Sequence, residues 1–206
     1  YETDLKQMLT NVLKEKRFAA KLISNETYFD SELVIIAVGT PSDRGEIDLV
    51  YIKQVSILLA NYIKSNENFV AVVVKSTVIP GTTDTVIRGI IEENSGKTLG
   101  QFGLGMNPEF LREGSAIDDF MRPDRVVIGH DDEKTLKLME KLYEPWDCDK
   151  IFVNTRTAEM IKYVNNSLLA IQISAANEFA NIAASIGGID IMDVMNGVFT
   201  DKRWSP

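Results

Sequence analysis

The chain has 206 residues, enough for one large domain or for one domain and the start of a second. Hydrophobic residues make up 45 % of it and charged residues 25 %, which excludes a disordered, collagen-like or low-complexity sequence. Thirty acidic residues against 22 basic ones give a net charge of -8, and this charge argues against general binding to nucleic acids or to anionic membranes.

Cysteine and histidine each occur once. Cys148 alone excludes an internal disulfide framework, and His130 alone leaves no imidazole or thiolate cluster for zinc, so we expect no metal site. Asp147 and Asp149 flank Cys148 and disfavour its thiolate form, which makes it a poor nucleophile. No charged segment followed by an apolar one opens the chain, so a cytoplasmic protein is expected.

Short β-branched apolar runs alternate with longer amphipathic stretches over most of the chain. This alternation predicts an α/β fold with a partial, Rossmann-like, doubly wound parallel sheet. Helical periodicity predicts helices over residues 48–63 and 132–143, with another entered after residue 80. The expected strands cover residues 33–38, 69–74, 102–106, 125–128 and, at an edge, 151–153.

The character of the sequence changes at Thr155. Between residues 160 and 186 only Lys162 and Glu178 are charged, which predicts one long helix buried on most sides. Several amide side chains make this stretch too polar to span a membrane. Gly187 and Gly188 end the helix, and Asp190 is expected to cap a short helix that reaches residue 196. We therefore predict a nucleotide-binding domain over residues 1–153 and the start of a helical domain over residues 154–206.

Small and hydroxylated residues follow three of the predicted strands. Ligands of an open parallel sheet bind beyond the carboxyl ends of its strands, and small side chains let the backbone approach a nucleotide. Each stretch alone is typical of a turn, but three together favour a binding site. The stretches are residues 39–42, 75–77 and 107–109.

Two pairs of polar residues stand four positions apart. Glu109 and Glu113 would share a face if their segment were helical, either as a solvated pair or with one carboxylate serving as a base. Lys162 and Asn166 share a face of the long helix, where an ammonium beside an amide could stabilise an oxyanion. The alternative for Lys162 is a side chain that extends to water, and composition does not separate the two.

Five strings, in order and over nearly the whole chain, resemble the UDP-glucose/GDP-mannose dehydrogenase family. Two of them, DFMRPDRVVIG and TAEMIKY, look most like the UDP-glucose 6-dehydrogenase branch. The strings are VGTP at 38–41, KSTVIPGTT at 75–83, NPEFLREGSAIDDFMRPDRVVIG at 107–129, TAEMIKYVNNSLLAIQIS at 157–174 and DKR at 201–203.

The resemblance implies oxidation of the C6 alcohol of a nucleotide sugar to a carboxylate, in two hydride transfers to NAD and through an enzyme-bound thioester. UDP-glucose is the expected substrate, with UDP-N-acetylmannosamine, UDP-N-acetylglucosamine and GDP-mannose as alternatives. The long helix resembles the family's connecting helix, which implies a homodimer formed through the helical region.

The resemblance also assigns roles to single residues, each by its match to a family motif. The implied NAD-binding residues are Thr40, Pro41, Ser76, Thr77 and Glu113. The implied catalytic residues are Thr77, which helps to order a water, Glu109, the base of thioester hydrolysis, and Lys162 and Asn166, which bind the reacting oxygen. The implied substrate-binding residues are Glu109, Phe110, Leu111, Arg112, Glu113, Lys162, Asn166 and, toward a neighbouring subunit, Arg203.

Two family features are missing from this sequence. A G-x-G-x-x-G turn is expected before Tyr1, and a nucleophilic cysteine is expected after Pro206. We therefore expect the chain to be part of a longer protein and to be inactive alone. Two alternative hypotheses are a β-hydroxyacid dehydrogenase and a truncated, non-catalytic protein that binds a nucleotide sugar or pairs with a full-length subunit.

Overall fold

The computed structural model describes residues 2–22, 31–43 and 45–204. The chain forms two compact units, Tyr1–Lys162 and Tyr163–Pro206. Among the described residues, no helix is both long enough and apolar enough to cross a membrane.

The first unit is built on a mixed sheet. Within the described residues the strand order is β1 (Leu33–Ile36), β4 (Ala71–Val74), β5 (Gly103–Met106), β6 (Arg125–His130) and β7 (Asp149–Val153), so the last strand is an edge strand as predicted. Strands β1, β4 and β5 are parallel, β5 and β6 are antiparallel, and β6 and β7 are again parallel.

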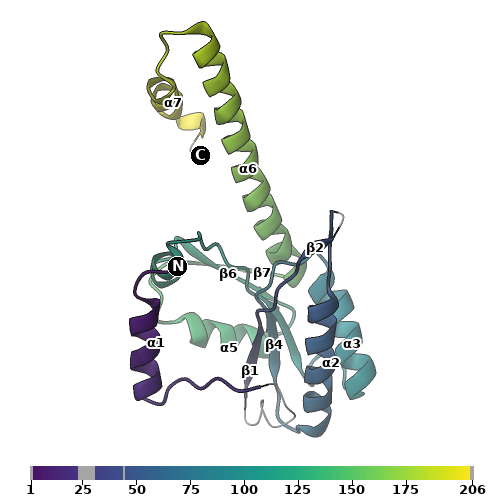
Figure 1. Cartoon of the computed structure of the whole chain (residues 1–206). Helices are drawn as coiled ribbons and strands as arrows, with labels where there is room; N and C mark the ends of the chain where they lie inside the picture. The colour runs from purple at the N-terminus through teal and green to yellow at the C-terminus, as the bar shows by residue number, and fades with distance from the viewer. Residues whose placement is uncertain (1, 23–30, 44, 205–206) are drawn as a thin grey trace. The chain divides into compact units, whose positions relative to one another are not determined.

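Helices cover both faces of this sheet, as the doubly wound prediction requires (Figure 1). The helices of the two layers are α2 (Val50–Ser65), the π-helix η1 (Thr82–Ile87) with α3 (Arg88–Ser95), and α5 (Glu133–Tyr143). Side chains of β4 alternate between the faces: Val72 and Val74 pack with residues of α2 and α3, and Val73 packs with Met139 of α5.

The antiparallel step between β5 and β6 departs from the predicted parallel sheet. Met106 pairs with Gly129, so β6 starts beyond the carboxyl end of β5 and runs back along it. Residues 107–124, which include α4 (Ala116–Met121), therefore stay at the end of the sheet where β5 finishes. An apolar run has the same pattern in either direction, so the sequence alone does not separate the two pairings.

Three short elements of the first unit are absent from the predicted set. They are the helix α1 (Leu5–Lys14), the hairpin of β2 (Ser42–Asp43) with β3 (Glu46–Ile47), and the helix α4.

The long helix α6 (Thr155–Ile186) has the predicted extent. Gly187 and Gly188 follow it with φ of 79° and 70°, which glycine adopts without strain. Asp190 accepts a hydrogen bond from the Met192 amide at 2.8 Å and caps α7 (Ile191–Phe199), and the short η2 (Lys202–Trp204) ends the described chain.

The described residues leave the apolar side chains of α6 exposed, so its burial against neighbouring helices stays a prediction. Leu168 is 55 % exposed, Ile171 63 % and Ile173 61 %. A helix that is apolar all round needs neighbours to cover it, and composition does not say whether the same chain supplies them.

Gly103 of β5 lies directly under the capped end of α5. Asp132 accepts hydrogen bonds from the Thr135 amide at 2.8 Å and from the Thr135 hydroxyl at 2.7 Å, which caps the helix. A Cβ on Gly103 would lie 1.9 Å from the Thr135 Oγ1 atom and 2.6 Å from the Phe69 ring. The close approach of helix and sheet therefore requires glycine at this position.

We predict that Gly103→Ala lowers the free energy of unfolding by about 1–3 kcal/mol because the added methyl group displaces the cap. Urea denaturation measures the change. Gly89→Ala is the matched control, since a Cβ there meets no atom within 4 Å and α3 favours alanine by about 0.5–1 kcal/mol. Equal effects of the two substitutions would contradict the packing argument.

Candidate active site

Two loops at the carboxyl edge of the sheet are joined by hydroxyl groups. The Thr40 hydroxyl, after β1, donates to the Thr77 carbonyl oxygen at 2.8 Å. The Ser76 hydroxyl, after β4, donates to the Val38 carbonyl oxygen at 2.7 Å. Because β1 and β4 are neighbours, two of the stretches that the sequence singles out lie side by side.

Pro41 lies in the first of these loops and is exposed. Its carbonyl oxygen accepts a hydrogen bond from the Asp48 amide at 2.8 Å. This bond joins the two ends of the segment that contains the β2–β3 hairpin.

Lys162 and Glu109 form an ion pair in the first unit. The Lys162 ammonium donates to Glu109 Oε1 at 2.8 Å and to the Glu109 carbonyl oxygen at 2.6 Å. The Lys162 side chain is only 8 % exposed, against 30 % for that of Glu109. Burial excludes the alternative in which Lys162 extends to water. The structure thus joins one member of each pair that the sequence picked out separately.

Phe110 lies beside this pair. Its ring centre is 5.4 Å from the Lys162 nitrogen and 4.1 Å from the Arg125 guanidinium carbon. The electron-rich face of an aromatic ring attracts cations, so Phe110 helps to hold both side chains at the edge of the core.

A network of three residues holds the start of the loop that carries Glu109. Asn107 Oδ1 accepts hydrogen bonds from the Lys75 ammonium at 2.8 Å and from the Tyr143 hydroxyl at 2.5 Å. The side-chain nitrogen Nδ2 of Asn107 donates to the Val127 carbonyl oxygen at 2.9 Å. Tyr143 is absent from the predicted site. Lys75 lies in the predicted stretch 75–77, but the sequence assigns it no role of its own.

Burial and charge set the protonation of these groups. Burial lowers the pKa of Lys75 from 10.5 to about 8; Glu109 opposes this shift and Lys162 adds to it. Burial raises the pKa of Glu109, but hydrogen bonds from Lys162 and Leu111 and the charge of Lys75 outweigh burial and hold that pKa below its ordinary value. Glu109 is therefore a carboxylate at neutral pH, able to accept a proton.

Glu113 does not share a helix face with Glu109, because residues 107–114 are irregular and α4 begins only at Ala116. Glu113 and Leu111 are exposed. Arg112 is also exposed and pairs with Asp119, with 2.6 Å between the Arg112 terminal nitrogen and Asp119 Oδ1. The loop from Leu111 to Glu113 thus presents its side chains to solvent.

Asn166 and Arg203 belong to the second unit. Asn166 is exposed on α6, and Arg203 donates from Nε to both oxygens of Asp201, at 3.0 and 2.9 Å. The roles that the resemblance assigns to them toward a substrate stay predictions.

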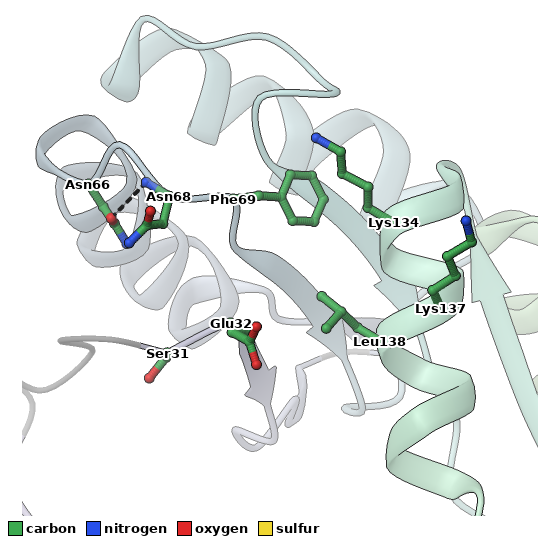
Figure 2. Close-up of a pocket in the computed structure, with 8 residues that line it drawn as sticks. All are labelled: Ser31, Glu32, Asn66, Asn68, Phe69, Lys134, Lys137 and Leu138. Atoms are coloured by element: carbon green, nitrogen blue, oxygen red, sulfur yellow. Dashed lines mark hydrogen bonds between the residues drawn. The ribbon is translucent and has the colours of Figure 1, made fainter.

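A cavity of about 600 Å³ lies at the opposite edge of the sheet, before the strands β1 and β4 (Figure 2). Lys134 of α5 extends over the Phe69 ring there, with its nitrogen 4.9 Å from the ring centre. None of the predicted site residues lines this cavity. Its lining consists of Ser31, Glu32, Asn66, Asn68, Phe69, Lys134, Lys137 and Leu138.

We predict that Lys75 makes stability depend on pH. Its pKa is lower in the folded state, about 8, than its ordinary value of 10.5, so the folded state holds fewer protons between these values. The cost of burying the ammonium is therefore full below pH 8 and is relieved as the pH rises to 10.5. Urea denaturation across this range should show wild type gaining stability relative to Lys75→Met, whereas the exposed-lysine variant Lys134→Met should show no such trend. A constant difference between wild type and Lys75→Met would refute the assignment.

Family models match both parts of the chain. Residues 1–147 match the NAD binding domain of the UDP-glucose/GDP-mannose dehydrogenase family, and residues 156–206 match the central domain of that family. NAD is therefore the cofactor of the domain to which the first unit corresponds.

Relatives with two different sugar substrates are similar to the chain. GDP-mannose 6-dehydrogenase of Pseudomonas aeruginosa is 39 % identical over 198 residues, which cover 94 % of this chain and 45 % of the relative. UDP-glucose 6-dehydrogenase of Rickettsia bellii is 36 % identical over 207 residues, which cover 98 % and 46 %. The chain thus spans about half the length of the curated relatives that it matches.

Solved structures agree with these matches. A ternary complex of the Pseudomonas aeruginosa GDP-mannose dehydrogenase superposes with a TM-score of 0.94 at 38 % identity, over 98 % of this chain and 47 % of that one. A UDP-glucose dehydrogenase of Pyrobaculum islandicum superposes with a TM-score of 0.92 at 37 % identity, over 98 % and 46 %. A 3-hydroxyisobutyrate dehydrogenase of Mycobacterium tuberculosis, at 18 % identity and a TM-score of 0.60, shares the fold alone. By its strands, its paired loops and both family matches, this chain belongs to the UDP-glucose/GDP-mannose dehydrogenase family.

Proposed function

We propose that this chain supplies the cofactor-binding loops and the reacting cation of an enzyme that oxidises the C6 alcohol of a nucleotide sugar to a carboxylate. UDP-glucose is the proposed substrate, on the strength of the strings at 119–129 and 157–163. The observation that carries the proposal is the ion pair of a buried Lys162 with Glu109. This contact between Lys162 and Glu109 is evidence that does not depend on the family match.

The joined loops after β1 and β4 are suited to a nicotinamide cofactor. Gly39 leaves open space beside the backbone, since a Cβ there would meet no atom within 4 Å. Thr40 and Thr77 are half-buried beside this space. NAD bound there would accept a hydride, and Thr40, Pro41, Ser76, Thr77 and Glu113 are the residues proposed to hold it.

Lys162 is proposed to bind the oxygen that loses its proton during oxidation. An ammonium that is 8 % exposed faces little competition from water, so its attraction for a developing alkoxide is strong. Its bonds to Glu109 also leave one of its three protons for another acceptor. Asn166, one turn further along α6, is the proposed second donor.

Glu109 is proposed to act as the base of the second half-reaction. Its carboxylate is ionised at neutral pH and 30 % exposed, so a water molecule can reach it and give up a proton. The family resemblance implies that this water attacks a thioester on a cysteine that the present sequence does not include.

The apolar side chains of α6 support a proposed homodimer. Leu168, Ile171 and Ile173 are all more than half exposed in the single chain, and an obligate subunit interface is rich in such side chains. Arg203 is the residue proposed to reach a sugar bound to the partner.

The reaction is tested by NADH formation at 340 nm with purified protein, after intact mass spectrometry has established which residues it contains. We expect the enzyme that carries this chain to form two NADH per sugar, with a higher kcat/KM for UDP-glucose than for GDP-mannose. The chain of 206 residues alone is expected to form none. A preference for GDP-mannose would overturn the substrate, and the absence of NADH from the complete enzyme would overturn the reaction.

Lys162→Met is expected to lower kcat about a hundredfold or more, because it removes the charge that stabilises the reacting oxygen and keeps the apolar stem. Lys134→Met, an exposed lysine on α5, is the control and should leave kcat unchanged. Turnover of Lys162→Met within a factor of about two of wild type would refute the role of Lys162.

A further inference from the structure

Glu159 is a carboxylate with no exposed surface, and neither the proposed reaction nor the family motifs quoted above assign it a role. It lies in the second turn of α6. Charged residues are rarely buried this completely unless hydrogen bonds replace the lost water. Its partners therefore indicate what it does.

Both oxygens of Glu159 bind the short stretch of residues 81–83, at the start of η1. Oε2 accepts a hydrogen bond from the Gly81 amide at 2.5 Å. Oε1 accepts from the Thr83 amide at 2.8 Å and from the Thr83 hydroxyl at 2.6 Å. Amides at the start of a helical stretch have no partner within it, so the carboxylate satisfies donors that would otherwise be buried unpaired.

The stretch that Glu159 holds is the far end of the loop that follows β4. The near end of that loop is fixed by Ser76 and Thr77, through the bonds that join it to the loop after β1. A second link acts at the far end, where Arg156 Nε donates to Asp84 Oδ2 at 2.5 Å. The first turns of α6 are thus fastened to η1 at two points.

Lys162 follows Glu159 by three residues on the same helix, and residues three apart lie on one face. A helix turn is stiff, so whatever fixes Glu159 fixes the turn that bears Lys162. Of the two described links, Glu159 is the buried one, and it reaches the end of the loop that contains Thr77.

We propose that Glu159 is a positioning residue of the active site: its carboxylate sets the distance between the loop after β4 and the helix turn that bears Lys162. This inference rests on the proposed function, because it assigns Lys162 to the reaction. A displacement of about 1 Å in a catalytic group can cost about a hundredfold in rate, so the link matters for turnover even where the fold survives without it.

Glu159→Gln tests the link without changing the size of the side chain. In either orientation the new amide group sets an NH₂ against the Gly81 or the Thr83 amide, so at least one hydrogen bond is lost. Thr83→Val removes only the hydroxyl donor and should have a smaller effect in the same direction. Glu140→Gln, at an exposed position of α5, is the matched control and should have none.

The first readout is amide hydrogen exchange of the protein, which needs no activity. We expect Glu159→Gln to speed exchange at Gly81 or Thr83 by about tenfold or more, with the control at the wild-type rate. Unchanged protection at both amides in a folded variant would overturn the link, whether or not the enzyme oxidises a nucleotide sugar.

The second readout separates positioning from stability. In the complete enzyme, Glu159→Gln should lower kcat about tenfold or more, with KM for UDP-glucose changed by less than about twofold. In a Lys162→Met background the same substitution should lower kcat by less than about twofold further, because the group that it positions is gone. Equal losses in both backgrounds, or an unchanged kcat with fast exchange, would overturn the positioning role. No NADH from wild type would overturn the proposed function and leave the exchange result standing.

Discussion

A buried ammonium group must find an opposite charge or lose its proton, and Lys162 is buried. It finds Glu109, which follows β5 and is 53 positions away in sequence. Satisfying this one charge brings the start of α6 to the loop after β5. The hydrogen bond from Lys75 to Asn107 then fixes the start of that loop, and Phe110 packs against the core. These contacts together compensate the burial of the Lys162 ammonium.

The direction of β6 explains why so many of the proposed site residues come from one segment. A parallel crossover would carry the chain to the far edge of the sheet before the next strand. Because β6 runs back from the edge where β5 ends, residues 107–124 spend their whole length at that edge. Glu109, Phe110 and Arg112 therefore all lie near the carboxyl end of β5.

Much of the fold could be predicted from local pattern, because strands and helices are set by periods of a few residues. The five strands, the extent of α6 and the Asp190 cap are examples. What failed depends on distant partners. The sequence left open whether Glu109 and Glu113 share a helix face, and they do not, because the segment is irregular and Gly114 adopts a φ of 85°. The pairing of Lys162 with Glu109, and the part played by Tyr143, arise only when separate segments pack, and no local period records them.

The hydroxyl groups that join the loops after β1 and β4 also limit what those loops can recognise. A hydroxyl has one proton, and Thr40 and Ser76 each give theirs to a carbonyl oxygen of the protein. While these hydrogen bonds are kept, the two hydroxyls offer only lone pairs to a neighbouring group. Such lone pairs suit groups that donate, as ribose hydroxyls and a carboxamide NH₂ do, better than the oxygens of a phosphate. Two hydrogen bonds within the protein thus bias this end of the sheet toward ligand groups that donate.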